Sequence, residues 1–182
     1  MGWIFPIAIV ILWQLASGLG LIQAEWLPSP LTIAKTLFEL GRTGELWGHI
    51  GVTTLRVLVG FLIGAAAGTV AGAVTGYSKT ARKLLDPTLQ ALRNIPSMAW
   101  VPLFLLWLGI FEESKIALIA TGVFFPVYLT LASGIEQVDR KLVEVGELFG
   151  LGPKELILRI ILPAALPSWI TALRSGLSLG WM

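Results

Sequence analysis

Four long stretches without a charged residue most constrain the fold of this 182-residue chain. They occupy residues 1–24, 57–78, 94–111 and 116–135, and each runs for at least 18 residues without Asp, Glu, Lys or Arg. A helix rises 1.5 Å per residue, so about 20 residues cross the roughly 30 Å hydrocarbon layer of a membrane. A backbone exposed to lipid must satisfy its own hydrogen bonds, which requires helices here. We therefore predict an all-α fold, a polytopic bundle of membrane helices.

The composition agrees with a lipid environment and excludes several classes of function. Hydrophobic residues make up 55% of the chain and charged residues only 13%, about half the charged share of a soluble domain. The net charge of +2 is small and dispersed, which argues against a nucleic-acid partner. There is no cysteine and a single histidine, and no catalytic or phosphate-loop motif is present. We expect no catalytic residues, no metal site and no cofactor, so the chain does not hydrolyse ATP itself.

Loop charges predict the orientation of the spans. The turn 77–83 carries Lys79, Arg82 and Lys83 with no acid, whereas 111–115 carries Glu112 and Glu113 against one lysine. Basic loops face the cytoplasm, which places the turn 77–83 and the N-terminus inside. The basic segment 136–159 then also lies inside, and the chain is multi-pass.

A fifth apolar stretch follows Pro163 and Pro167. Only residues 168–182 remain after Pro167, about 22 Å of helix, which is too short to cross comfortably. We expect the chain to stop inside a membrane helix. The predicted organisation is one transmembrane domain over 1–182, incomplete, with about five spans and a loop at 136–163.

Glycines recur at every fourth position of the second span and form one stripe along the helix. Such a stripe lets another backbone approach closely, and we favour tight helix packing over a flexible, pore-lining helix. The stripe consists of Gly60, Gly64, Gly68, Gly72 and Gly76.

The region around Pro96 is the candidate substrate pathway. Prolines within spans free backbone carbonyls, which transport proteins use around a pathway, although kinks also serve packing alone. Arg56 and Arg93 lie close to span ends, where an arginine either snorkels to the interface or attracts an anion. We take Arg93, Asn94 and Ser97 as the pathway candidates.

The segment 139–163 has the pattern of a helix–turn–helix elbow. Apolar residues recur at helical spacing up to Leu148 and Phe149, opposite charged positions that include Glu144. Gly150 and Gly152 permit the backbone angles that end a helix, and the proline that follows suits the first turn of another. The second helix is expected to end at Pro163, and an interfacial helix pair lying on lipid is the alternative reading.

The same segment resembles a known signature. Glu144, then Gly150, then Ile160 and Leu162-Pro163 match E-A-A-x-x-x-G, nine further residues, and I-x-L-P. That signature is typical of permease subunits of bacterial binding-protein-dependent ABC importers. Val145 and Gly146 stand where the family usually has alanine. Segments 53–61, 85–96 and 99–109 also resemble the subfamily that imports nitrate, taurine and aliphatic sulfonates.

The resemblance implies a type I ABC importer permease in the bacterial inner membrane, with partners to match. These would be a cytoplasmic ATP-binding subunit, a second permease copy in a homodimer, a periplasmic solute-binding protein and the lipid bilayer. The translocated solute would be a small sulfonate, taurine or nitrate-like anion. The residues of the elbow that would contact the ATPase subunit are Glu144, Gly146, Leu148, Phe149, Gly150, Leu151, Gly152 and Pro163.

A transporter driven by an ion gradient is the main alternative, since it too uses kinked helices and midplane sites. It requires intramembrane acidic or histidine side chains or unwound Na⁺ sites, and the four predicted spans contain no acidic residue. A membrane scaffold without transport would explain the glycine stripe but not the elbow.

Overall fold

The computed structural model describes residues 2–23, 25 and 27–182, and these residues contain helices and no strands. The all-α membrane fold expected from the sequence is confirmed. The chain divides into two compact units, Met1–Thr53 and Thr54–Met182.

The first unit holds two helices, α1 (Ile4–Gly18) and α2 (Pro30–Thr43), and the beginning of α3 (Glu45–Tyr77). The Ser29 hydroxyl accepts the Thr32 N–H and caps α2, with a proline in the first turn. The Leu31 N–H donates to Gln14 Oε1 at 3.1 Å and ties α2 to α1. Gly44, at φ 87°, ends α2 and leads directly into α3.

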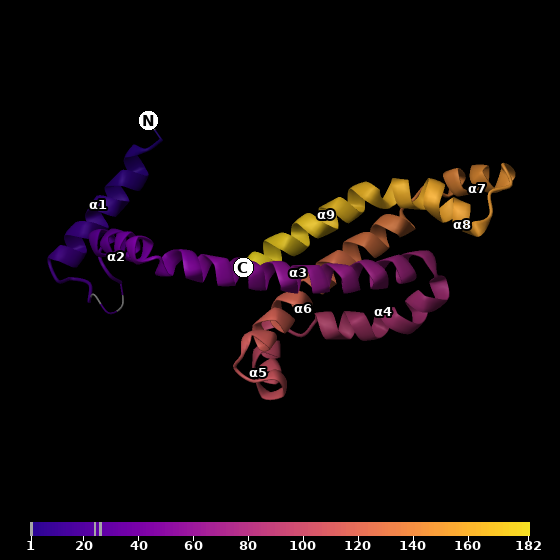
Figure 1. Ribbon diagram of the computed structural model, residues 1–182. Coiled ribbons are helices and arrows are strands. Elements are labelled where there is room, and N and C mark those ends of the chain that lie inside the picture. Colours follow the sequence, from indigo (N-terminus) through magenta and orange to yellow (C-terminus); the bar gives the residue numbers. More distant parts are fainter. Residues whose placement is uncertain (1, 24, 26) are drawn as a thin grey trace. The chain divides into compact units, whose positions relative to one another are not determined.

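The second unit holds the rest of α3 and all the later helices (Figure 1). These are α4 (Lys79–Arg93), α5 (Ser97–Leu108), α6 (Glu112–Glu136), α7 (Arg140–Leu148), α8 (Pro153–Leu156), the π-helical turn η1 (Ile157–Ile161) and α9 (Leu162–Trp181).

The glycine stripe of α3 packs against the backbone of α6. A Cβ added at Gly68 would lie 2.8 Å from the Phe124 carbonyl oxygen, and one at Gly72 would lie 2.8 Å from that of Tyr128. The partners on α6 advance in the same order as the glycines, from Ile119 opposite Gly60 to Ile135 opposite Gly76, so the helices run parallel. The stripe therefore serves close helix packing, the interpretation that the sequence favoured.

Helix α9 completes the core on another side of α6. Ala65, Val123, Val127 and Ala172 are buried together, and Phe61, Ile119 and Leu173 pack around them. Cβ atoms at Gly176 and Gly180 would meet Val123 on α6, whereas Gly134 near the end of α6 faces Ser168. Helix α9 thus runs antiparallel to α6.

Two arginine–glutamate pairs join α3 and α4 to the two ends of α6. Arg56 donates from Nε and Nη2 to the Glu112 carboxylate at 2.5 and 2.9 Å. At the other end, Arg82 donates to Glu136 and also to the Thr75 carbonyl oxygen. The Arg56 guanidinium is thus held by Glu112 at the start of α6 and reaches the end of the span, as expected for a snorkelling side chain.

The helices of membrane length differ from the predicted spans. Glu45–Tyr77, Glu112–Glu136 and Pro153–Trp181 are each long and apolar enough to cross, and α1, at 15 residues, is shorter. The predicted span at 94–111 is not one continuous helix: α5 covers Ser97–Leu108, and α4 and α5 form a pair bent by 94°. Ile95 precedes a proline, which disfavours the helical region, and Pro96 has no N–H to donate.

The fifth stretch is longer than the sequence suggested. The helix does not end at Pro163 but continues through η1 into α9, so Pro153–Trp181 spans 29 residues. Pro163 lies in the first turn of α9, directly after η1, where the Leu162 N–H donates to the Ile157 carbonyl five residues back. The length argument for a helix too short to cross is therefore wrong.

Candidate functional site

A cavity of about 790 Å³ lies at the bend between α4 and α5 and faces α6 and the end of α9. Arg93 and Ser97, two of the three pathway candidates, line it, and Asn94 does not. The break at Ile95 and Pro96 turns α5 away from the direction of α4 and leaves this space. The lining residues are Arg93, Ile95, Ser97, Met98, Trp100, Val101, Leu118, Ile119, Thr121, Gly122, Phe125, Pro126, Leu129, Leu179, Gly180 and Met182.

The cavity has one positive group and a largely apolar wall. Arg93 is exposed and makes only a long 3.5 Å contact to Gln90 Oε1, so N–H groups of its guanidinium can donate hydrogen bonds to a ligand in the cavity. The Thr121 hydroxyl donates to the Ala117 carbonyl at 2.8 Å, which leaves its oxygen able to accept. Among the described residues that line the cavity, none is acidic. The arrangement suits a small anion that carries an apolar part.

Thr121, Trp100 and Phe125 were missed by sequence reasoning. Trp100 stacks on Phe104 with ring centroids 5.8 Å apart, which fixes the indole on the α5 side. Thr121 and Phe125 are four residues apart on α6 and so share a face. That spacing was visible in the sequence, but nothing in it indicated that this face meets α5.

The elbow, residues 139–163, has the predicted helix–turn–helix form (Figure 1). Asp139 is the N-cap of α7, and its side chain accepts a hydrogen bond from the Lys141 N–H. It ends in a Schellman motif: the Leu151 N–H donates to the Gly146 carbonyl and the Gly150 N–H to the Glu147 carbonyl. Gly150 has φ 76°, so this turn needs the glycine.

The other two glycines of the elbow have different roles. Gly146 is buried, and a Cβ there would lie 2.6 Å from Leu156 Cδ2, so the missing side chain lets α7 pack on α8 and η1. Gly152 has φ −69° and ψ 166°, extended backbone that any residue adopts. The expectation that Gly152 is needed for its backbone angles is therefore wrong. Its N–H donates to the Glu155 carboxylate at 3.4 Å and caps α8.

The tip of the elbow exposes two large apolar side chains. Leu148 and Phe149 are 87% and 83% exposed, and Leu151 is partly buried beneath them. Glu144 lies on the surface of α7, 3.7 Å from Arg140. Pro163 is exposed on α9 and does not belong to the tip. Of the site residues named from the sequence, Leu148 and Phe149 thus form the exposed tip. Gly146 lets α7 pack on the next helix, and Pro163 lies within α9.

Helices of membrane length, a broken helix pair and an exposed elbow define the class of this chain: it is a polytopic helical membrane protein. Residues 60–182 match the family model described as binding-protein-dependent transport system inner membrane component. The chain therefore belongs to this family of ABC-type permeases.

Individual relatives match almost the whole chain. A putative aliphatic sulfonates transport permease protein of Bacillus subtilis is 44% identical over 181 residues, covering 100% of this chain and 66% of the relative. Its counterpart in Escherichia coli is 42% identical, with 99% and 68% covered. The taurine transport system permease protein of Escherichia coli is 32% identical, with 93% and 63% covered. The chain spans about two thirds of the length of these relatives.

Proposed function

We propose that this chain is the membrane-spanning subunit of an ATP-driven importer and forms part of the route by which a small anion crosses the cytoplasmic membrane. Family membership and the elbow support this over a carrier driven by an ion gradient. Residues 1–182 belong to one permease domain, with 136–163 as its coupling loop. ATP hydrolysis takes place on a separate subunit.

The orientation follows from the basic turns. Lys79, Lys83 and Lys154 lie in the segments that the positive-inside rule assigns to the cytoplasm, and the N-terminus is then cytoplasmic too. The elbow faces the compartment that holds ATP. A solute-binding protein delivers the anion from the opposite side, and a second copy of the chain completes the pathway.

The exposed tip of the elbow is the observation that carries the proposal. Phe149 and Leu148 project from a turn fixed by a Schellman motif, and apolar anchors of this kind supply much of the affinity of protein interfaces. Gly146 packs α7 onto α8 and η1, and η1 continues into α9. A displacement of the tip is therefore transmitted to a membrane helix, which is what coupling to an ATPase requires.

Co-purification of the ATPase subunit tests the docking role. Phe149→Ser removes an 83%-exposed anchor and should lower the recovered ATPase subunit at least about tenfold, because truncating a buried aromatic anchor costs 2 kcal/mol or more. Phe38→Ser on α2, where the phenylalanine is 72% exposed, is the matched control and should change nothing. Equal recovery with both variants would refute docking at the tip.

The solute is a small anion, with aliphatic sulfonates as the leading class. The names of the relatives indicate sulfonates and taurine, and the cavity offers one arginine and apolar walls. Arg93→Gln should raise the concentration for half-maximal sulfonate uptake about tenfold or more, because a hydrogen bond to a charged group contributes about 1.5–3 kcal/mol. Arg42→Gln on α2 is the charge-matched control. If Arg93→Gln leaves the half-maximal concentration unchanged, Arg93 does not contact the solute in the pathway.

A further inference from the structure

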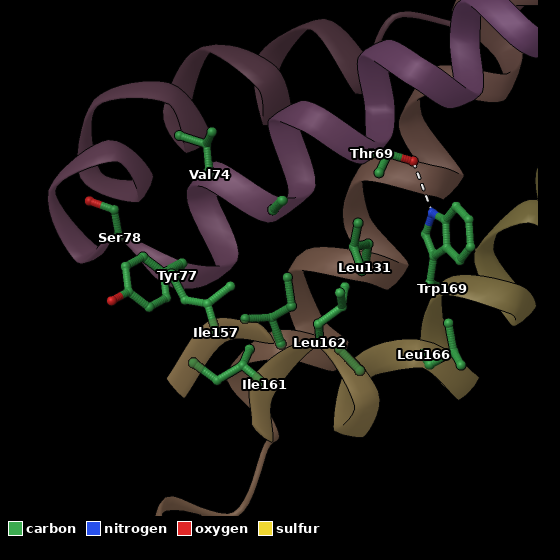
Figure 2. Close-up of a pocket in the computed structure, with 13 residues that line it drawn as sticks. Thr69, Val74, Tyr77, Ser78, Leu131, Ile157, Ile161, Leu162, Leu166 and Trp169 are labelled. Atoms are coloured by element: carbon green, nitrogen blue, oxygen red, sulfur yellow. Dashed lines mark hydrogen bonds between the residues drawn. The ribbon is translucent and has the colours of Figure 1, made fainter. Parts of the chain in front are cut away.

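A second hollow, which shares no residue with the cavity at the bend, runs between α3, α6 and the helix formed by η1 and α9 (Figure 2). We call it the apolar groove, and its volume is about 640 Å³. Thr69, Tyr77, Ser78 and Trp169 are its only lining residues with a polar atom in the side chain, and the others are aliphatic. Ligand sites of this size and apolar character are common in proteins.

The two ends of the apolar groove differ. At one end, Trp169 Nε1 donates to Thr69 Oγ1 at 3.0 Å, and this hydrogen bond joins α9 to α3 across the groove (Figure 2). At the other end lie Tyr77, the last residue of α3, and Ser78, which caps α4, opposite Ile157 at the start of η1. The groove is therefore bridged toward the middle of α3 and reaches the end of the helix on the basic side.

The depth of the apolar groove corresponds to one leaflet of a membrane. From Thr69 to Tyr77 the helix rises roughly 12 Å, at 1.5 Å per residue. The hydrocarbon core of a bilayer is roughly 30 Å thick, so one leaflet contributes roughly 15 Å. A hydrocarbon chain that enters at Tyr77 thus has the room to lie along the groove until it meets the Thr69–Trp169 hydrogen bond.

Two lysines are close in sequence to residues that line this end of the groove. Lys79 begins α4 directly after Ser78, and Lys154 lies in α8, which leads into Ile157. Arg82 and Arg159 are engaged by Glu136 and Glu155. In the described part of the chain, no ion pair involves Lys79 or Lys154. Basic pockets between membrane helices on the cytoplasmic side are typical sites for anionic lipid headgroups.

We propose that the apolar groove holds one acyl chain of an anionic phospholipid, whose headgroup lies between Lys79 and Lys154. The cytoplasmic position of the entrance rests on the orientation proposed above, and the site itself does not depend on transport. A bound lipid covers apolar surface at the junction where η1 continues into α9.

A membrane helix of another protein fits the groove less well. A crossing helix needs contact along about 30 Å, whereas the groove extends roughly 12 Å and is bridged by Trp169. The unpaired lysines at the entrance also match an anionic headgroup and offer nothing to an apolar helix.

Native mass spectrometry of the full chain tests the proposal. Detergent micelles carry equal amounts of phosphatidylglycerol and phosphatidylcholine with identical acyl chains. The wild-type chain should retain one phosphatidylglycerol, in preference to phosphatidylcholine by about tenfold or more, since each basic residue near the headgroup contributes about a fivefold preference. Equal retention of the two lipids would overturn the proposal.

Groove-filling variants separate this site from the general lipid surface. Ala73→Phe fills the groove from α3, and Leu166→Trp fills it from α9, so the result does not depend on one variant folding. Both should lose the retained phosphatidylglycerol. Ala66→Phe, an exposed position of α3 that does not line the groove, should keep it. Retention at the wild-type level by both filling variants would contradict the assignment.

Two further variants test the headgroup and the alternative occupant. Lys79→Gln should lower the preference for phosphatidylglycerol about fivefold and leave binding of a neutral lipid unchanged. Leu166→Cys supplies the only thiol in the chain, and it should form no intermolecular disulfide when oxidised in membranes. A disulfide-linked dimer at high yield would show that a second copy covers the groove, and would overturn the lipid assignment.

Discussion

Gly68→Ala tests the packing of α3 on α6 most directly. The added Cβ would lie 2.8 Å from the Phe124 carbonyl oxygen and 3.0 Å from Val127 Cβ. Neither atom is the flexible end of a side chain, so the two helices must move apart by about half an ångström to restore van der Waals distance. Overpacking of this kind costs about 1–3 kcal/mol, and α3 then loses close contact along the whole stripe.

Gly51→Ala on the same helix is the control. A Cβ at Gly51 meets nothing within 4 Å, so only the helix propensity changes, by up to about 1 kcal/mol in favour of alanine. Both variants share that gain, and the difference between their unfolding free energies isolates the clash. In reversible unfolding in mixed micelles, the unfolding free energy of Gly68→Ala should be about 1–3 kcal/mol lower than that of Gly51→Ala. Equal stability of the two would show that the helices are not in backbone contact at Gly68.

Three further predictions address other parts of the chain. A cysteine at Thr80 should react with an impermeant thiol reagent only from the cytoplasmic side, and one at Thr43 only from outside; the opposite pattern would invert the proposed topology. Gly150→Val should lose the ATPase subunit on co-purification while Gly150→Asn keeps it, because φ 76° costs a β-branched residue about 1–2 kcal/mol and asparagine less. Arg56→Gln should lower the unfolding free energy by up to about 1 kcal/mol while leaving the Lys115–Glu112 pair in place, and an unchanged unfolding free energy would mean that the Arg56–Glu112 pair contributes nothing.

Local signals account for the parts of the structure that the sequence predicted. The elbow follows from residues within one or two turns of each other: Asp139 at the start of α7, Gly150 after its end and a proline at the start of α8. The glycine stripe of α3 could also be predicted from the sequence, because a four-residue period places glycines on one face of any helix. The helix that packs against the stripe could not be predicted, since nothing close to Gly68 in the sequence indicates a contact with Phe124.

The errors arose where a distant residue or a proline decided the outcome. Hydropathy treats 94–111 as one apolar run, but Pro96 divides it, and the bend opens the cavity beside Arg93. The ion pair of Arg56 with Glu112, 56 positions later, had no local signal in the sequence. Pro163 was predicted to end a helix and Pro167 to precede a new span, although a membrane helix accommodates proline where a neighbouring turn adjusts its hydrogen bonds.

The π-helical turn η1 lies at the junction between the elbow and α9. A π turn accommodates one residue more than an α turn, and one residue of an α-helix corresponds to 100° of rotation. Because the extra residue is taken up within the π turn, removing a single residue from Ile157–Ile161 would restore α-helical bonding and leave the α9 face, with Ala172 and Gly176 on it, directed toward Val123. The junction therefore tolerates the loss of one residue, whereas one residue inserted into α9 between Leu162 and Ala172 would rotate the following part of the helix by about 100° relative to α8.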